Sequence, residues 1–374
     1  MYRPAITGSG VFTPETVITN AELVEAFNAY ADKWNAEHAD EIAAGDVAAK
    51  EHSSEDFILK ASGIEQRYVL DKTGVLNPDV MHPLLRQRSD DEPGVMAEMA
   101  VDACNKALAQ AGKTAEDVDA VICAASNLER AYPAVAIEIQ QLLGVKGFAF
   151  DMNVACSSAT FGIQAAADMV RSGSIRSALV VNPEICSAHL EWRDRDCHFI
   201  FGDVATAVLI ERTEDATGRY FEIKSTRCAT EFSNNIRNNN GFLRRSRPDG
   251  LKDRRDMQFM QNGRKVFKEV LPMVSQHIAD HMSEEGVEAS DLKRLWLHQA
   301  NKTMNDFIGR KVLGREPATG EQPNILQDYA NTSSAGSIIA FSKYSDDMAD
   351  GDTGVICSFG AGYSVGSVIV ERHG

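Results

Sequence analysis

The chain has 374 residues, 44% hydrophobic and 25% charged, which is typical of a soluble globular protein with two ordinary domains or one large α/β body. Its net charge of −16 disfavours general binding to nucleic acid or to anionic membranes. No apolar run approaches the roughly 18 residues that span a bilayer, and the opening MYRPAITGSGVF lacks the layout of a secretory signal.

Helical and strand patterns alternate along the chain, which predicts an α/β fold with a central sheet. In chain order, we expect a helix over 95–112, a strand over 118–125, a helix over 163–173, and strands over 178–185 and 205–212. The seven cysteines are scattered among these elements without a CxxC pair. Free thiols favour a reducing cytoplasm and argue against a disulfide framework or a metal site.

Three segments of the first half recur in the same order in the second half, which predicts a duplicated unit. AGKTAEDVDAVICAASN resembles EGVEASDLKRLWLHQAN 174 residues later, ACSSATFG resembles ANTSSAG, and FGDVATAVLIER resembles FGAGYSVGSVIVER. We place the division near residue 215, giving an N-terminal half over 1–215 and a C-terminal half over 216–374. If the halves are related, the loops around Cys156, His298 and Asn331 converge across a pseudo-twofold axis.

Cys156 lies among small residues, directly before the helix expected over 163–173. A lone cysteine is most often core filler. At a helix start, however, exposed N–H groups and the positive end of the dipole favour a thiolate, and such placement lowers a cysteine pKa to roughly 3.5–7.5. We therefore interpret Cys156 as a nucleophile whose small neighbours leave room for a substrate.

Two polar residues of the second half are candidates to work with this thiol. His298 ends an apolar strand in LWLHQAN, and Asn331 lies in ANTSSAG, where it is also compatible with a turn or helix cap. The sequence FGAG is either a plain turn or a glycine-rich loop that brings backbone N–H groups to a ligand. Cysteine, histidine and asparagine also occur together in papain-like proteases, so the residue types do not decide the reaction.

Taken in order, the motifs resemble those of the type III β-ketoacyl-acyl-carrier-protein synthases, condensing enzymes of the thiolase superfamily. The similarity runs from ITGSGVF to GSVIVER, nearly the whole chain. It rests on VACSSA around Cys156, HQAN from His298, NTSSAG from Asn331, FGD ending at Asp203, and FGAGYSVGS from Phe359. The resemblance implies the five-layered αβαβα thiolase fold made of two duplicated halves, and a homodimer.

The resemblance also implies a decarboxylative Claisen condensation without a cofactor. Cys156 attacks the thioester of an acyl-CoA primer and carries the acyl group. The backbone N–H groups of Cys156 and Ala361 form the oxyanion hole; alanine stands where the family has a glycine, but the N–H is kept. His298 and Asn331 stabilise the enolate left when malonyl-acyl-carrier protein loses CO₂. The products are 3-ketoacyl-acyl-carrier protein, CoA and CO₂, in fatty acid biosynthesis.

Other positions take substrate-binding roles from the same resemblance. Phe57 and Arg195 match the pair that sandwiches the CoA adenine. Tyr132, Ala159 and Phe201 match the acyl tunnel, with Tyr132 gating it across the dimer. Because Ala159 replaces a bulky aromatic residue, we expect a medium-chain primer, around octanoyl, in preference to acetyl-CoA.

An acidic acyl carrier protein requires a basic docking surface. The expected docking residues are Lys265, Lys268, Lys302, Arg310 and Lys311, with the run RRSRPDGLKDRR over 244–255, which is equally compatible with a solvated loop. Two segments look like insertions relative to shorter family members: 28–53, expected to be helical, and 71–93, a proline-containing loop.

Four rival functions stay open. A thiolase needs a second cysteine immediately before the glycine turn, where Ser358 stands, and a His–Pro start to the histidine motif. A non-decarboxylating acyltransferase, or a condensing enzyme of secondary metabolism, fits the same scaffold. A non-catalytic binding homologue is disfavoured because all three polar residues are present.

Overall fold

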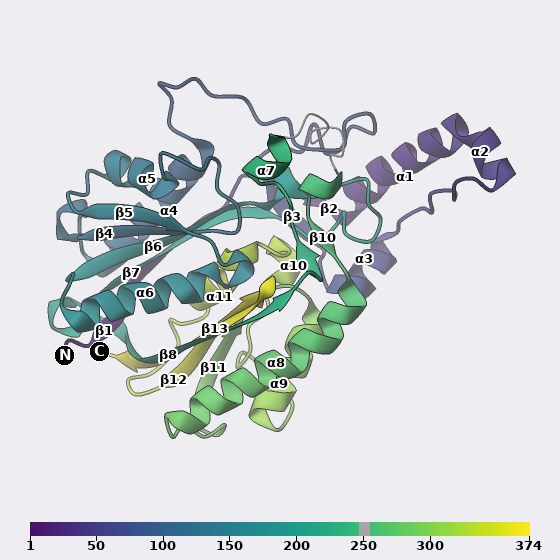
Figure 1. The fold of residues 1–374 in the computed structure, drawn as a ribbon. Helices are drawn as coiled ribbons and strands as arrows, with labels where there is room; N and C mark the ends of the chain where they lie inside the picture. Colours follow the sequence, from purple (N-terminus) through teal and green to yellow (C-terminus); the bar gives the residue numbers. More distant parts are fainter. Residues whose placement is uncertain (247–254) are drawn as a thin grey trace.

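A computed structural model describes residues 1–246 and 255–374. Two mixed sheets alternate with three layers of helices, so the five-layered thiolase-like fold is confirmed (Figure 1). The first half supplies five strands, β1 (Pro4–Phe12), β4 (Ala120–Ala124), β5 (Phe148–Met152), β6 (Ser177–Ile185) and β7 (Asp203–Arg212). The second half supplies four, β8 (Tyr220–Ser233), β11 (Leu292–Leu297), β12 (Thr353–Gly360) and β13 (Gly362–His373).

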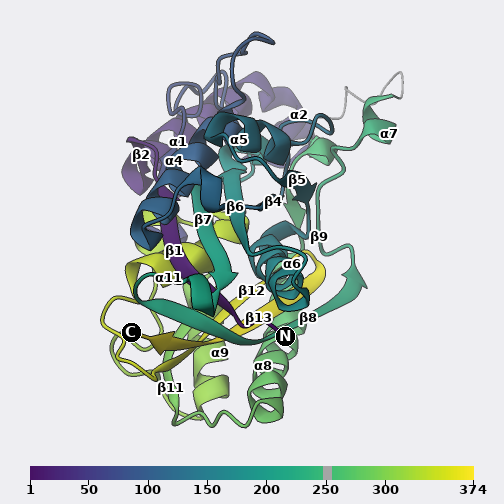
Figure 2. The same cartoon turned by 90° about the vertical axis from the view of Figure 1, so that its left-hand side faces the viewer.

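The two sheets join into one nine-stranded sheet, in the order β11-β12-β13-β8-β1-β7-β6-β4-β5. The junction is short, because β1 and β8 pair only through Ala5 with Glu222 and Ile6 with Phe221. Figure 2 shows the strands of both halves from the side of this junction. β4, β6 and β7 are almost wholly buried, as expected of strands covered by helices on both faces.

Each helix layer buries an apolar face against a sheet. Helices α4 (Val95–Ala111) and α5 (Val135–Leu143) cover the outer face of the first sheet, and α8 (Gly263–Glu284) and α9 (Lys302–Leu313) cover that of the second. Between the sheets lie α6 (Ser158–Ser172) and α11 (Gly336–Lys343). The helices and strands predicted in the sequence over 95–212 are confirmed as α4, β4, α6, β6 and β7.

The remaining elements lie around one end of the layers. They are the helices α1 (Asn20–Glu37), α2 (Ala39–Ala44), α3 (Glu55–Ser62), α7 (Phe242–Arg245) and α10 (Leu326–Tyr329), and the strand pairs β2 (Thr16–Thr19) with β3 (Gln66–Val69) and β9 (Ile236–Arg237) with β10 (Met260–Gln261). The first insertion forms the end of α1 and then α2, which project from the body (Figure 1). The second insertion, 71–93, contains no helix or strand. Among the described residues, no helix has the length and apolar character needed to cross a membrane.

The interior between the two sheets depends on one large side chain of β11. Trp296 is fully buried, packs edge-on against Phe221 and Phe341, and donates its indole N–H to the Tyr344 carbonyl at 3.1 Å. We expect Trp296→Ala to lower the free energy of unfolding by about 3–5 kcal/mol, measured by urea denaturation. Trp34→Ala, on the projecting helix α1, is the control and should cost about 1 kcal/mol or less. Equal losses for the two variants would contradict this description of the core.

Candidate active site

Cys156 lies where the two halves meet. It belongs to a short 3₁₀ turn, Ala155–Ser157, that runs directly into α6. The hairpin between β12 and β13 passes so close that a Cβ added at Gly360 would come 2.9 Å from the Cys156 sulfur. Only glycine allows this approach, so FGAG is more than a plain turn.

The environment of the thiol opposes its ionisation. Burial raises the pKa of Cys156 to about 11. Three hydrogen-bond donors act in the opposite direction and lower this pKa: the Ser333 hydroxyl, 3.4 Å from Sγ, and the backbone N–H groups of Ala361 and Cys156. The predicted fall in pKa at the helix start is therefore outweighed by desolvation. The N–H groups of Ala361 and Cys156 are also the two donors expected to form the oxyanion hole. They therefore converge beside the sulfur, where the negative charge of an oxyanion would develop.

His298 follows β11 and is almost completely buried. Its backbone N–H donates to the Cys357 carbonyl at 2.7 Å, and its ring packs edge-on against Phe359 at 5.1 Å. Burial lowers the pKa of His298 to about 4, and the adjacent Ser333 backbone offsets this only in part. The imidazole is therefore neutral at physiological pH, able to donate one hydrogen bond and to accept a proton.

Asn331 is held against the first half by its backbone. Its N–H donates to the Ile200 carbonyl at 2.9 Å, and its carbonyl accepts from the Gly202 N–H at 3.1 Å, on either side of Phe201. The side-chain oxygen of Asn331 accepts from the Ser333 N–H at 2.9 Å. This bond leaves the Nδ2 group to donate into the pocket that Asn331 lines.

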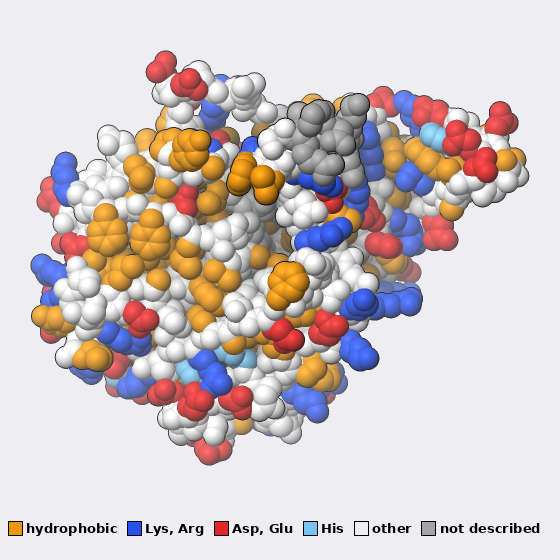
Figure 3. All heavy atoms as spheres, in the orientation of Figure 1, with side chains coloured by type: hydrophobic (Ala, Val, Ile, Leu, Met, Phe, Trp, Pro, Cys, Tyr) orange, Lys and Arg blue, Asp and Glu red, His pale blue; other side chains and the backbone are white. Residues whose placement is uncertain are grey.

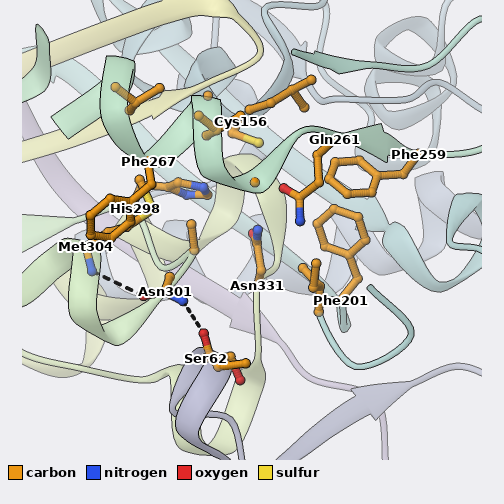
Figure 4. A pocket seen from close by; sticks show the side chains of 18 of the residues that line it. Ser62, Cys156, Phe201, Phe259, Gln261, Phe267, His298, Asn301, Met304 and Asn331 are labelled. Atoms are coloured by element: carbon orange, nitrogen blue, oxygen red, sulfur yellow. Dashed lines mark hydrogen bonds between the residues drawn. The ribbon is translucent and has the colours of Figure 1, made fainter. Parts of the chain in front are cut away.

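One pocket of about 300 Å³ contains all three residues. Figure 4 shows Cys156, His298 and Asn331 around its base, with Phe201, Phe259 and Phe267 on its walls. The convergence of the three loops, predicted from the internal repeat, is thus observed. Several other lining residues were not predicted from the sequence; they come from the residue before β10, from β10, from α8 and from α9: Phe259, Gln261, Phe267 and Met304. They fall in segments without a repeat partner or motif.

Phe57 and Arg195 lie together near this pocket, but not as an open sandwich. The Arg195 guanidinium lies 4.2 Å from the centre of the Phe57 ring, and its Nε donates to the His52 carbonyl at 2.8 Å. Phe57 also lines the pocket. In this arrangement the guanidinium and the phenyl ring contact each other, so an adenine could not insert between them. It could stack only on the outer face of the guanidinium or of the ring.

The three residues expected along the acyl tunnel lie in different places. Phe201 lines the pocket, as expected. Ala159 does not: it is fully buried between the sheets, because α6 directs it into the core beside Ile163. Tyr132 is 85% exposed on this chain and lines no part of the pocket. The inference of primer length from Ala159 therefore loses its direct structural support.

The expected docking residues lie on α8 and α9. Lys265 and Lys268 are exposed and have no ion pair with any residue that the structure describes, and α8 also contributes pocket-lining residues. Lys302 and Arg310 pair with acidic side chains of their own region, and Lys311 lies over the Phe307 ring. Of the run 244–255, residues 247–254 lie outside the described residues. Its flanks are paired, Arg244 with Asp256 and Arg255 with Asp194.

Comparison with known families gives two matches in chain order. The description 3-oxoacyl-[acyl-carrier-protein (ACP)] synthase III matches residues 150–227, and the C-terminal part of the same family matches residues 282–372. The first match contains Cys156 and the second contains His298 and Asn331.

Whole-chain relatives agree with these matches. The β-ketodecanoyl-[acyl-carrier-protein] synthase of Pseudomonas aeruginosa is 54% identical over 351 residues, covering 94% of this chain and all of the relative. The β-ketoacyl-[acyl-carrier-protein] synthase III of Granulibacter bethesdensis is 29% identical, covering 99% of this chain and all of the relative. A crystal structure of 3-oxoacyl-[acyl-carrier-protein] synthase III from Aquifex aeolicus shares the fold, with a TM-score of 0.76 at 23% identity, covering 98% of this chain and 99% of that one.

The pKa of the thiol makes a test of the site possible without substrate. Because the pKa of Cys156 is about 11, its alkylation by iodoacetamide should accelerate about tenfold per pH unit between pH 6 and 9, without a plateau. The rate is measured by intact mass, with Cys156→Ser as the blank for the other thiols. A plateau below pH 8 would contradict this account and show that the helix start dominates over burial.

Proposed function

The chain belongs to the 3-oxoacyl-[acyl-carrier-protein] synthase III family of acyl-transferring condensing enzymes, and from that premise we propose that it joins a medium-chain acyl-CoA to malonyl-acyl-carrier protein. The observation that carries the proposal is the single pocket that holds Cys156, His298 and Asn331. A thiol beside two neutral donors suits a reaction in which an acyl group is first stored on sulfur and then transferred to a carbanion.

In the first half-reaction, the Cys156 sulfur attacks the thioester carbonyl of the primer. The thiol proton passes to neutral His298 in the same pocket, and the oxyanion of the tetrahedral intermediate takes the N–H groups of Cys156 and Ala361. The bond to the CoA sulfur then breaks, and CoA leaves as a thiol with the proton returned. Loss of one oxyanion donor typically slows such a step by about 10²–10³.

In the second half-reaction, the malonyl thioester oxygen accepts hydrogen bonds from His298 and Asn331. The bond to the carboxylate breaks, CO₂ leaves, and its electron pair forms an enolate held by these donors. The enolate carbon attacks the acyl carbonyl on Cys156, the bond from that carbonyl to sulfur breaks, and the thiolate takes a proton that comes from solvent. Loss of CO₂ supplies the carbanion, so no strong base is required, in keeping with the low pKa of His298, about 4.

The primer length follows from the name of the 54% identical relative. A β-ketodecanoyl product has ten carbons, and malonyl contributes two after CO₂ is lost, so that relative's name implies an eight-carbon primer. We propose the same, octanoyl-CoA, for this chain. The apolar walls that include Phe201, Phe259 and Phe267 are compatible with an alkyl chain of this kind.

The two substrates reach the pocket over different surfaces of the protein. The CoA adenine stacks on the outer face of the Phe57–Arg195 pair, which borders the pocket. The acidic carrier protein docks on α8 and α9. Lys265 and Lys268 lie on α8, the helix that also lines the pocket, and neither has an ion pair with a residue that the structure describes. Lys302, Arg310 and Lys311 extend this basic surface along α9.

We propose a homodimer that forms along β5, the edge strand of the sheet. Phe148 on β5 is 46% exposed and stacks with Phe150, and Tyr132, Ile137 and Leu142 are exposed beside it. Figure 3 shows apolar side chains gathered over this part of the molecule. A partner on this face would bury Tyr132, consistent with a gating role across the dimer.

Seven free cysteines support a cytoplasmic location.

The test is intact mass after incubation with acyl-CoAs from C2 to C12, followed by malonyl-acyl-carrier protein. We expect octanoyl-CoA to acylate Cys156 most readily, no adduct on Cys156→Ser, and loss of the adduct with formation of a 3-ketodecanoyl product after malonyl addition. Loading by acetyl-CoA but not octanoyl-CoA would contradict the primer assignment. An adduct that persists would favour a non-decarboxylating acyltransferase, and no adduct would favour a binding homologue.

A further inference from the structure

A buried carboxylate, used in no step of this mechanism, connects the two halves beneath the site. Glu184, at the end of β6, is 1% exposed. It accepts hydrogen bonds from the Ser126 N–H at 2.9 Å and hydroxyl at 2.5 Å, and from the Ser334 N–H at 3.3 Å and hydroxyl. Ser126 follows β4 of the first half, whereas Ser334 belongs to the turn Ser333–Ala335 of the second half.

The residue next to Ser334 touches all three candidate catalytic residues. The Ser333 N–H fixes the Asn331 amide at 2.9 Å, its hydroxyl donates to the Cys156 sulfur at 3.4 Å, and its backbone lies against the His298 ring. Ser333 has a φ of +50°, a left-handed conformation that is unfavourable for residues with a Cβ. Such a conformation persists when neighbouring bonds hold it, and Ser334 is held by Glu184.

The position of Glu184 is costly, which argues that its bonds serve a purpose. Burial raises the pKa of Glu184 to about 7, despite the donors from Ser126 and Ser334. Among the described residues, Glu184 has no ion pair with a cation. The Cys186 sulfur lies 3.9 Å from its carboxylate, and the charge of Glu184 also raises the pKa values of Cys123 and Cys156. An apolar residue here would remove this cost and also the bonds that tie Ser334 to Ser126 through the carboxylate.

We propose that Glu184 is a positioning residue that clamps the Ser333–Ala335 turn to the first half and so aligns Cys156, His298 and Asn331 with one another. The proposal rests on the proposed function in assigning those three residues to catalysis. It extends that function by naming a group that acts on both half-reactions without touching substrate.

The proposal predicts different effects on the two half-reactions for substitutions at positions 184 and 333. Glu184→Ala releases the turn, so octanoyl transfer to Cys156 and malonyl decarboxylation should each fall about tenfold or more. Glu184→Gln keeps the shape and an acceptor oxygen, so both steps should stay within about threefold of the wild type. Ser333→Ala keeps the backbone bonds and loses only the hydroxyl, so acyl transfer should fall while decarboxylation stays near the wild-type rate.

The matched control is another buried carboxylate far from the site. Glu211 lies at the opposite end of β7 from Asp203, is 2% exposed, and pairs with Lys113 at 3.0 Å. Glu211→Ala should leave both half-reactions unchanged per folded enzyme. Glu184→Ala with wild-type rates, or with a loss in only one half-reaction, would overturn the proposal.

A readout without substrate separates this proposal from the proposed function. Glu184→Ala and Glu184→Gln both remove the negative charge of the carboxylate, but only the Gln variant keeps an acceptor for Ser126 and Ser334. A difference between the two variants in the rate of Cys156 alkylation by iodoacetamide therefore reports the effect of these hydrogen bonds and not that of the charge. Alkylation should be about threefold or more slower in Glu184→Ala than in Glu184→Gln, and adding Ser333→Ala should slow only the Gln variant. Equal rates, or equal slowing in both, would overturn the clamp. If the variants show this pattern but the wild type catalyses no condensation, the proposed function alone fails.

Discussion

The site depends on the close packing of two equivalent turns, one from each half of the chain. Ala155 and Ser333 stand first in these turns, and both have left-handed backbone conformations, with φ of +47° and +50°. The pairing brings the Ser333 hydroxyl to the Cys156 sulfur, and the Gly360 backbone closes the other side without room for a side chain. Because each turn runs into a helix between the sheets, α6 or α11, the layered core fixes the relative position of the two turns.

Burial gives this site a consistent electrostatic character. Desolvation keeps the Cys156 thiol and the His298 imidazole neutral, and the thioester formed on sulfur is neutral as well. Negative charge therefore develops only transiently, on the oxyanion of the first half-reaction or on the enolate of the second. At both places the hydrogen-bond donors are already in position. In surroundings of low dielectric, such fixed donors act more strongly than they would in water. With a pKa of about 11, the resting thiol ionises only weakly at physiological pH, so its attack on the primer requires a proton acceptor.

The sequence predicts the residues that carry motifs and misses those that depend on packing. Cys156, His298 and Asn331 were found because they stand in short motifs, and the internal repeat predicted that their loops converge. The five-layered fold was implied by the family resemblance. Ala159 was assigned to the tunnel from the family resemblance, but α6 turns its side chain into the core.

Contacts between distant segments were beyond the reach of the sequence pattern. The stacking of Phe57 on Arg195 joins residues far apart in the chain, and its closed form has no local signal. Glu184 did leave a signal, the one charged residue in the mainly apolar strand ALVVNPEI, but only the structure shows that Ser334 is its partner. The apparent helix-start effect on Cys156 failed because the extent of burial is a tertiary property.

The central claim is that one pocket performs two separable half-reactions, with Cys156 holding the acyl group while His298 and Asn331 make the carbanion. The most direct test is a single turnover, in which purified octanoyl-enzyme is mixed with malonyl-acyl-carrier protein and both CO₂ and the 3-ketodecanoyl product are followed. The account predicts that the wild type releases the two together. His298→Ala forms the octanoyl-enzyme more slowly, because the thiol has lost its proton acceptor, and Asn331→Ala forms it at a rate near that of the wild type; once loaded, both release CO₂ at least about a hundredfold more slowly. Rapid CO₂ release by either variant would contradict the assignment of the enolate to these two donors.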